Sequence, residues 1–132
     1  MEMGRIPVHM SQRSIIIVED QAEVAEMLAE MVRVCGYNAV TCDISQTALG
    51  LIAEHDTAIV LLDIMMPDVS GIEILTTLRQ DVTHTQIPVI LISALSLPMD
   101  IHNGLAAGAN AYLTKPVNFQ ELKRLIEQLA NQ

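Results

Sequence analysis

Short apolar runs alternate with longer amphipathic segments along nearly the whole chain. The runs have the length and composition of buried strands, and they cover residues 14–18, 39–42, 58–62, 88–92 and 111–114. In the segments between them, apolar residues recur every three or four positions, as they do on one face of a helix. The pattern therefore predicts five consecutive units, each a strand followed by a helix.

Residues at the expected helix ends support this division. Gly36 follows the apolar stripe of the first helix, and a glycine in that place is typical of a helix C-terminus. Ser70 predicts the start of the third helix and Asn118 the start of the last, because their side chains accept hydrogen bonds from the free N–H groups of a first turn.

Strand-helix units with short connections predict a doubly wound α/β fold, in which a parallel sheet carries helices on both faces. The runs at 58–62 and 88–92 are apolar at nearly every position, as central strands buried on both faces are. The chain of 132 residues has the length of one domain, which we assign to residues 14–132. In such sheets ligands bind beyond the carboxyl ends of the strands.

Polar residues are expected at that same edge of the sheet. Glu19 and Asp20 follow the first run, Asp63 follows the third, Ser93 the fourth and Lys115 the fifth. If these strands are parallel and adjacent, three carboxylates and one ammonium group converge there. A charged cluster at the end of buried strands predicts a functional site.

Composition limits the classes of partner. The net charge of −9 argues against electrostatic binding of nucleic acid or anionic lipid. No segment approaches the roughly 18 unbroken apolar residues of a membrane span, so we expect a cytoplasmic protein with no membrane partner and no direct nucleic acid binding. Cys35 and Cys42 lack metal-ligand spacing and are expected to be reduced thiols. Residues 1–13 match no structural pattern and are expected to form a flexible extension.

Four motifs carry a resemblance to a known family: Val18-Glu19-Asp20, the segment LDIMMPDVSG at 62–71, Ile92-Ser93-Ala94, and the segment YLTKP at 112–116. In this order and at these spacings they resemble the receiver domain of two-component response regulators, such as the chemotaxis response regulator. The resemblance covers about residues 14–130. It implies a flavodoxin-like fold of five parallel strands in the order 2-1-3-4-5.

By this resemblance Asp63 is the phosphoacceptor, which takes a phosphoryl group from the phosphohistidine of a histidine kinase. A carboxylate is a competent nucleophile, but three neighbouring acids would repel an anionic phosphoryl group. A divalent cation resolves this conflict, and Mg²⁺ prefers oxygen ligands. The resemblance implies that Asp20, Asp63 and the backbone carbonyl of Met65 bind Mg²⁺ directly and that Glu19 acts through water.

Other roles follow from the same resemblance. Ser93 and Lys115 would contact oxygens of the phosphoryl group, and the Lys115–Pro116 peptide bond would be cis. Ser93 and Tyr112 would form a switch that changes the surface of the fourth helix, fifth strand and fifth helix. The domain would then be a signalling phosphoacceptor that catalyses its own phosphorylation and dephosphorylation, and not an enzyme with a separate substrate.

The sequence departs from the family pattern at Glu19 and at Asn110-Ala111. Glu19 replaces the commoner aspartate. Met65 and Leu95 occupy the positions that flank the approach of water to the phosphoryl group; neither orients a water molecule, so we expect slow self-dephosphorylation. Asn110 and Ala111 replace an acidic pair that many receivers use in dimerisation, which favours a different protein partner or a weak homodimer.

Other classes fit the sequence less well. A phosphatase of the haloacid dehalogenase type resembles this pattern but has a second acid where Met65 stands. A nucleotide- or flavin-binding module would have a glycine-rich turn where residues 19–22 carry acids. A receiver that binds partners without phosphorylation remains a further alternative.

Individual residues also have simpler interpretations. Asp20 could cap a helix, Lys115 could be a solvated surface lysine, and Ser93 could make only local hydrogen bonds. Tyr112 could be an ordinary aromatic residue at the edge of the core.

The most specific interpretation is a receiver domain, either alone or as part of a longer regulator. Its expected upstream partner is a sensor histidine kinase or a phosphotransfer protein. Its expected downstream partner is an effector protein or an output domain.

Overall fold

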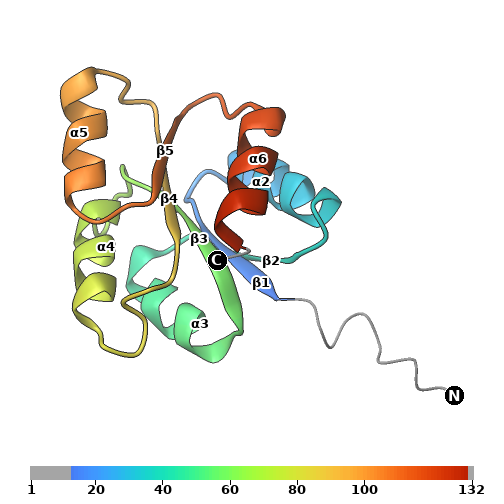
Figure 1. Cartoon of the computed structure of the whole chain (residues 1–132), viewed down its shortest axis with the longest axis horizontal. Coiled ribbons are helices and arrows are strands. Elements are labelled where there is room, and N and C mark those ends of the chain that lie inside the picture. Colours follow the sequence, from blue (N-terminus) through green and yellow to red (C-terminus); the bar gives the residue numbers. More distant parts are fainter. Residues whose placement is uncertain (1–12, 131–132) are drawn as a thin grey trace, which may run out of the picture.

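A computed structural model describes residues 13–130 of the chain. One parallel sheet contains β1 (Ser14–Val18), β2 (Asn38–Cys42), β3 (Thr57–Asp63), β4 (Val89–Ser93) and β5 (Ala111–Thr114). The strand order is β2-β1-β3-β4-β5 (Figure 1), which confirms the predicted doubly wound fold. The expected N-terminal extension lies outside the described residues, apart from Arg13.

Two of the strands end one residue later than the apolar runs that predict them. Asp63 pairs with Ile92 and Ser93 pairs with Thr114, so both polar residues belong to the ladder. Backbone pairing does not depend on the polarity of a side chain, and it therefore continues past the last apolar residue. As a consequence, the sheet itself holds the backbone of Asp63 and of Ser93 in place.

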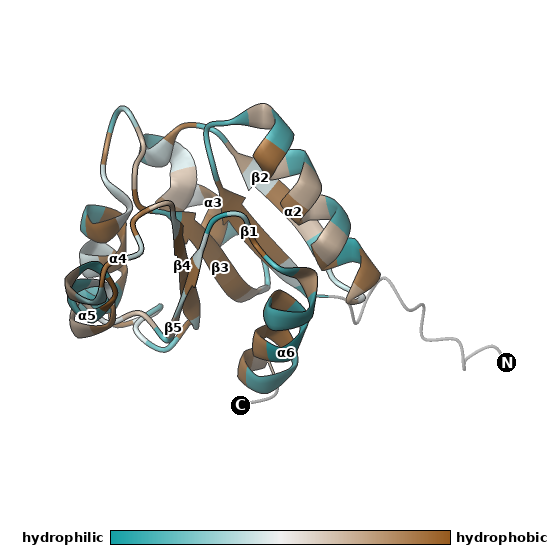
Figure 2. Ribbon diagram, turned by 90° about the horizontal axis from the view of Figure 1, so that it is seen from above, coloured by the Kyte–Doolittle hydropathy of each residue, from teal (hydrophilic) through white to brown (hydrophobic). Residues whose placement is uncertain are grey.

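The side chains of each strand alternate between two apolar layers. On one face, the sheet packs against α2 (Ala22–Val34) and α6 (Phe119–Ala130). The other face packs against α3 (Ala48–Glu54) and α4 (Gly71–Gln80), with the short helix η2 (Ser45–Thr47) before α3, and α5 (Pro98–Ala106) lies beside β5. Figure 2 shows the hydrophobic strands enclosed by helices with hydrophilic outer surfaces.

The predicted helix ends are present. Gly36 follows α2 with φ of +95°, a left-handed conformation that glycine adopts readily. The Ser70 hydroxyl accepts a hydrogen bond from the N–H of Ile72 at 3.1 Å, and Asn118 Oδ1 accepts one from the N–H of Glu121 at 3.0 Å. None of the helices among the described residues has the length and apolar character needed to cross a membrane.

Candidate functional site

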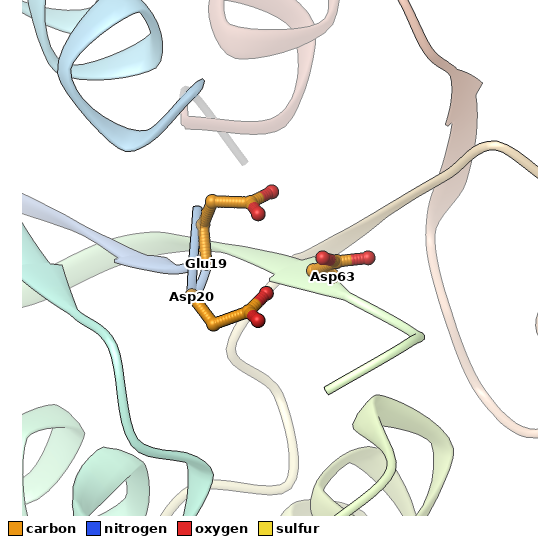
Figure 3. A group of neighbouring side chains, drawn as sticks. All are labelled: Glu19, Asp20 and Asp63. Atoms are coloured by element: carbon orange, nitrogen blue, oxygen red, sulfur yellow. The ribbon is translucent and has the colours of Figure 1, made fainter. Parts of the chain in front are cut away.

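The predicted site residues meet at the carboxyl edge of the sheet. Glu19 directly follows β1, Asp63 ends β3, and these two strands are neighbours. Figure 3 shows the carboxylates of Glu19, Asp20 and Asp63 gathered at this edge. One carboxylate oxygen of each residue lies within 4.8 Å of the others. The sheet order thus brings together acids that are more than 40 positions apart in the sequence.

The three acids differ in their environment. The side chains of Glu19 and Asp63 are buried, whereas Asp20 is exposed. The N-cap of α2 is Gln21, and its N–H donates to Glu19 Oε2 at 3.1 Å. The interpretation of Asp20 as the helix cap is therefore wrong, because the chain enters the helix one residue later. Asp20 remains available to a ligand from solvent.

Lys115 supplies the positive charge of the site. Its Nζ atom lies 3.0 Å from Glu19 Oε1 and 3.2 Å from Asp63 Oδ2, and its side chain is 19% exposed. The backbone N–H of Lys115 donates to the carbonyl of Ser93 at 2.9 Å, and the Lys115–Pro116 peptide bond is cis as predicted. The interpretation of Lys115 as a solvated surface residue is wrong, since the ammonium group lies between two buried carboxylates.

The charges of the site do not balance. Burial raises the pKa of Glu19, and the negative charge of Asp63 raises it further against the lowering effects of Lys115 and the Gln21 N–H. Burial alone would lower the pKa of Lys115, but its contacts with Glu19 and Asp63 raise it. The site therefore has a surplus of negative charge and gains stability from an added positive charge.

The residues present fit a magnesium ion. Glu19 Oε1 is buried and has no hydrogen bond, although the ammonium group of Lys115 lies at ion-pair distance from it. The available donors are carboxylate oxygens from three residues, the ligand type that Mg²⁺ prefers. Three carboxylates that share a single ammonium group leave oxygens available to a hard cation.

The loop after Asp63 is tightly folded. The N–H of Met65 donates to Asp63 Oδ1 at 3.2 Å, and the N–H of Gly71 donates to the carbonyl of Ile64 at 3.0 Å. A Cβ atom at position 71 would collide with the backbone carbonyl of Asp63. Glycine therefore allows the start of α4 to approach β3 and close the loop.

A second set of contacts, which sequence reasoning missed, ties this loop to η2. The carboxylate of Asp68 accepts hydrogen bonds from the N–H groups of Ser45 at 3.3 Å and Gln46 at 3.1 Å. The buried hydroxyl of Ser45 donates to the carbonyl of Val69 at 2.8 Å. These partners are more than 20 positions apart in sequence, so no local pattern could reveal them.

Ser93 and Tyr112 are linked through one residue of the connection between β4 and α5. The fully buried Ser93 accepts a hydrogen bond at Oγ from the N–H of Leu95 at 3.1 Å. The hydroxyl of Tyr112 donates to the carbonyl of Leu95 at 2.7 Å. Leu95 thus connects a residue at the edge of the acid cluster with the aromatic residue predicted to act as a switch.

The site opens to solvent through a cleft of about 300 Å³, lined by Asp20, Gln21, Asp63, Met65, Ala94 and Lys115. Met65 is 59% exposed and forms part of the wall, whereas Leu95 is not among the described residues that line the cleft. Gln21 was missed by the sequence analysis. Its position directly after Asp20, where β1 leads into α2, is the signal that could have identified it.

Comparison with known proteins agrees with this geometry. The response regulator receiver domain family matches residues 15–127. The phosphate regulon transcriptional regulatory protein PhoB of Pseudomonas aeruginosa is 34% identical over 110 residues, which cover 83% of this chain and 48% of PhoB. The chain spans about half the length of the curated relatives it matches.

Solved structures give the same result. The signal receiver domain of a DNA-binding response regulator from Colwellia psychrerythraea has a TM-score of 0.85 and 27% identity, with 92% of this chain and 100% of that chain covered. The receiver domain of the sensor histidine kinase PA1611 from Pseudomonas aeruginosa, which has a magnesium ion coordinated in its active site cleft, has a TM-score of 0.83 and 26% identity, with coverages of 92% and 99%. With its motifs, its sheet order and its acid cluster in agreement, this chain belongs to the response regulator receiver domain family.

Proposed function

We propose that Asp63 accepts a phosphoryl group from the phosphohistidine of a sensor histidine kinase or a phosphotransfer protein. The observation that carries this proposal is the position of Asp63, buried at the end of β3 yet lining the cleft beside Asp20 and Lys115. A carboxylate oxygen of Asp63 forms a bond to phosphorus as the P–N bond of phosphohistidine breaks. The electron pair of that bond leaves with the imidazole nitrogen.

The acid cluster determines what this transfer requires. Asp20, Asp63 and the backbone carbonyl of Met65 would hold Mg²⁺ directly, and Glu19 would hold it through water. Bound Mg²⁺ supplies positive charge that offsets the carboxylates and the incoming phosphoryl group. Lys115 keeps its contact with Glu19 and turns its remaining donors toward an oxygen of the phosphoryl group, which a compact ammonium charge suits.

The hydroxyl of Ser93 couples the modification to the surface. It accepts a hydrogen bond from the N–H of Leu95, and as a hydroxyl it can also donate its own proton to a phosphoryl oxygen. Movement of Ser93 toward that oxygen would pull the connection between β4 and α5 with it. Tyr112 would follow, because its hydroxyl donates a hydrogen bond to the carbonyl of Leu95 in that connection. The responsive face then comprises α5, β5 and α6.

This face has apolar side chains that a partner could cover. Leu97 and Met99 at the start of α5 are 66% and 67% exposed, and Leu105 near its end is also exposed. The curated relatives are transcriptional regulators of about twice the length of this chain. The partner we propose is therefore an output domain or a separate effector protein in the cytoplasm, and a weak homodimer on the same face is a second form of output.

Labelling with acetyl phosphate tests the assignment of Asp63. The parent chain should become phosphorylated in the presence of Mg²⁺ and should remain unlabelled when the metal is chelated. Asp63→Asn should abolish the labelling, because the amide is not a nucleophile. Asp56→Asn is a suitable control, since Asp56 is an exposed acid that pairs with Arg13 at the opposite edge of the sheet. Undiminished labelling of the Asp63→Asn protein would contradict the proposal.

A further inference from the structure

The aromatic ring of Tyr112 lies against a glycine of α5. A Cβ atom at Gly104 would lie 3.0 Å from Cδ2 and 3.2 Å from Cε2 of Tyr112, and 2.8 Å from Cδ1 of Leu91. Leu91 and Tyr112 are partners in the pairing of β4 with β5. The two side chains therefore form one surface, and α5 reaches it only because residue 104 has no side chain.

The backbone does not explain this glycine. Among the described glycines, only Gly36 and Gly108 have positive φ, whereas Gly104 is an interior residue of the helix Pro98–Ala106. Glycine inside a helix is destabilising relative to alanine, because it loses more conformational freedom on folding. What Gly104 provides is space for the ring.

The surroundings decide which neighbour would yield to a methyl group at position 104. Leu91 is fully buried in the apolar layer between the sheet and α3 and α4, where close packing resists displacement. Tyr112 is half-buried, and its hydroxyl lies at the exposed rim, where it donates to the carbonyl of Leu95. The ring is therefore the group that moves outward, and its bond to Leu95 is lost.

We infer that Gly104 is a positioning residue, which seats the ring of Tyr112 against α5 and thereby fastens the connection between β4 and α5 to that helix before any phosphoryl group arrives. The role of this contact in signalling rests on the proposed function, but the packing of Tyr112 against Gly104 does not. In this arrangement the ring is already in place, so a movement of Ser93 and Leu95 carries Tyr112 and α5 with it.

Tyrosine fluorescence of the unphosphorylated protein tests the seat directly. The chain has two tyrosines and no tryptophan, so Tyr37→Phe leaves Tyr112 as the sole fluorophore. In this background Gly104→Ala should cause a loss of protection from acrylamide quenching. It should also shift the ionisation midpoint of the phenol, which burial raises in the parent, down toward the ordinary pKa of 10.0.

Gly50→Ala is the matched control. Gly50 lies in α3, and a Cβ atom there would have nothing within 4 Å. It should change neither quenching nor the ionisation midpoint. Quenching of the Gly104→Ala protein equal to that of the parent would overturn the inference. Acetyl phosphate labelling of the parent reports separately on the proposed function, because the fluorescence experiment involves no phosphorylation.

Thermal unfolding provides a second test that tolerates a poorly folded variant. In a Tyr112→Ala background the ring is absent and Leu91 has room to move, so Gly104→Ala should raise Tm through its better helix propensity. In the parent background the same substitution should lower Tm or prevent folding. An equal rise of Tm in both backgrounds would show that the methyl group at position 104 does not clash with the ring of Tyr112, and would overturn the inference.

Discussion

Two partly buried cations lie at opposite edges of the sheet, and their surroundings differ. Arg79, near the end of α4, donates to the carbonyls of Gly108 at 2.9 Å, Thr85 at 3.3 Å and Ile87 at 2.7 Å, and to Asn110 Oδ1 at 2.9 Å. All of these acceptors are neutral, and each nitrogen of the guanidinium group has a partner. The Arg79 cluster is complete without a ligand.

The Lys115 cluster at the carboxyl edge is not complete. Its ammonium group lies between the buried carboxylates of Glu19 and Asp63. A carboxylate oxygen of Asp20 lies within 4.8 Å of an oxygen of each of these two acids, so three carboxylates share one ammonium group. Like charges held so close together cost free energy in the folded state. The contrast separates two kinds of partly buried cation. Arg79 has its hydrogen-bond partners within the chain, whereas the carboxylates around Lys115 keep a surplus negative charge that a ligand could balance.

Removal of Arg79 should have the largest effect on stability. Arg79→Ala should lower the free energy of unfolding by about 2–4 kcal/mol, because it removes the side-chain donor to three partly buried carbonyls. Urea unfolding measures this loss. Arg33→Ala is the control: its pairs with Glu26 and Glu30 are exposed, so the change should stay within about 0.5 kcal/mol. A similar small loss for Arg79→Ala would break the comparison.

Magnesium should stabilise the Lys115 cluster and leave the Arg79 cluster unaffected. Saturating Mg²⁺ should raise the free energy of unfolding of the parent by about 1–3 kcal/mol relative to NaCl of equal ionic strength. Asp20→Asn should lose most of this gain, because it removes the exposed carboxylate of the set. Arg79→Ala should retain the gain in full. A magnesium effect that survives in Asp20→Asn would show that the metal binds elsewhere.

The pH dependence of stability should identify Glu19 as a source of the surplus charge. Its pKa is raised above the ordinary 4.5, so the folded state binds this proton more tightly than the unfolded state does. Between the two pKa values the free energy of unfolding therefore falls as the pH rises. Without Mg²⁺, Glu19→Gln should remove this fall from urea unfolding curves recorded between 4.5 and neutral pH.

Asp68 offers a control of opposite sign. Desolvation acts to raise the pKa of its exposed carboxylate, but several hydrogen bonds, among them those from η2, together hold that pKa below the ordinary 3.8. Its stabilising contribution is present above that value and is lost as the pH falls through the lowered pKa. Asp68→Asn should therefore leave the fall above 4.5 intact. An identical pH profile for Glu19→Gln and the parent would contradict the charge argument.

The same contrast explains how much could be predicted from the sequence. Apolar runs predict buried strands, and the polar residue that follows a run marks the carboxyl end of that strand. Asp63, Ser93 and Lys115 could therefore be placed at the carboxyl edge of the sheet from the sequence alone. Arg79 could not, because its acceptors lie in separate connections at a distance of up to 31 positions. The close packing of Gly104 against Tyr112 and Leu91 could not be predicted either, since a glycine in a helical segment does not indicate which side chains of other elements lie next to it.

Asn110 shows a middle case. The sequence identifies it as a replacement in an acidic pair and so weakens the expectation of a salt-bridged dimer. Its actual role depends on tertiary contacts: Asn110 Oδ1 accepts hydrogen bonds from Arg79 and from the N–H of Val89, each at 2.9 Å. The residue is therefore part of the structural cluster, and its side-chain oxygen is already engaged within the chain.

The smallest effect should come from Met65, which tunes the Lys115 cluster without belonging to its charges. Met65 lines the cleft and is largely exposed, and we expect its thioether to hinder the approach of water to a phosphoryl group on Asp63. Met65→Asn replaces this apolar cover with an amide that can orient a water molecule. The phosphorylated protein should then decay a few-fold faster, which corresponds to a barrier lower by less than about 1.4 kcal/mol.

Decay of label in Mg²⁺ after removal of acetyl phosphate measures this rate. Leu95 is not among the described residues that line the cleft. The further increase in decay rate on adding Leu95→Glu to the Met65→Asn protein should therefore be smaller than the increase that Met65→Asn causes in the parent. Met99→Asn is the matched control, because Met99 is also a largely exposed methionine and lies on α5, away from the cleft. If Met65→Asn decays no faster than the parent, the side chain of Met65 does not exclude water, and slow dephosphorylation would need another cause. The side chain of Met65 carries no charge, so Met65→Asn should leave the stabilisation by Mg²⁺ unchanged. Faster decay together with unchanged stabilisation would show that the lifetime of the phosphoryl group and the binding of Mg²⁺ depend on different features of the site.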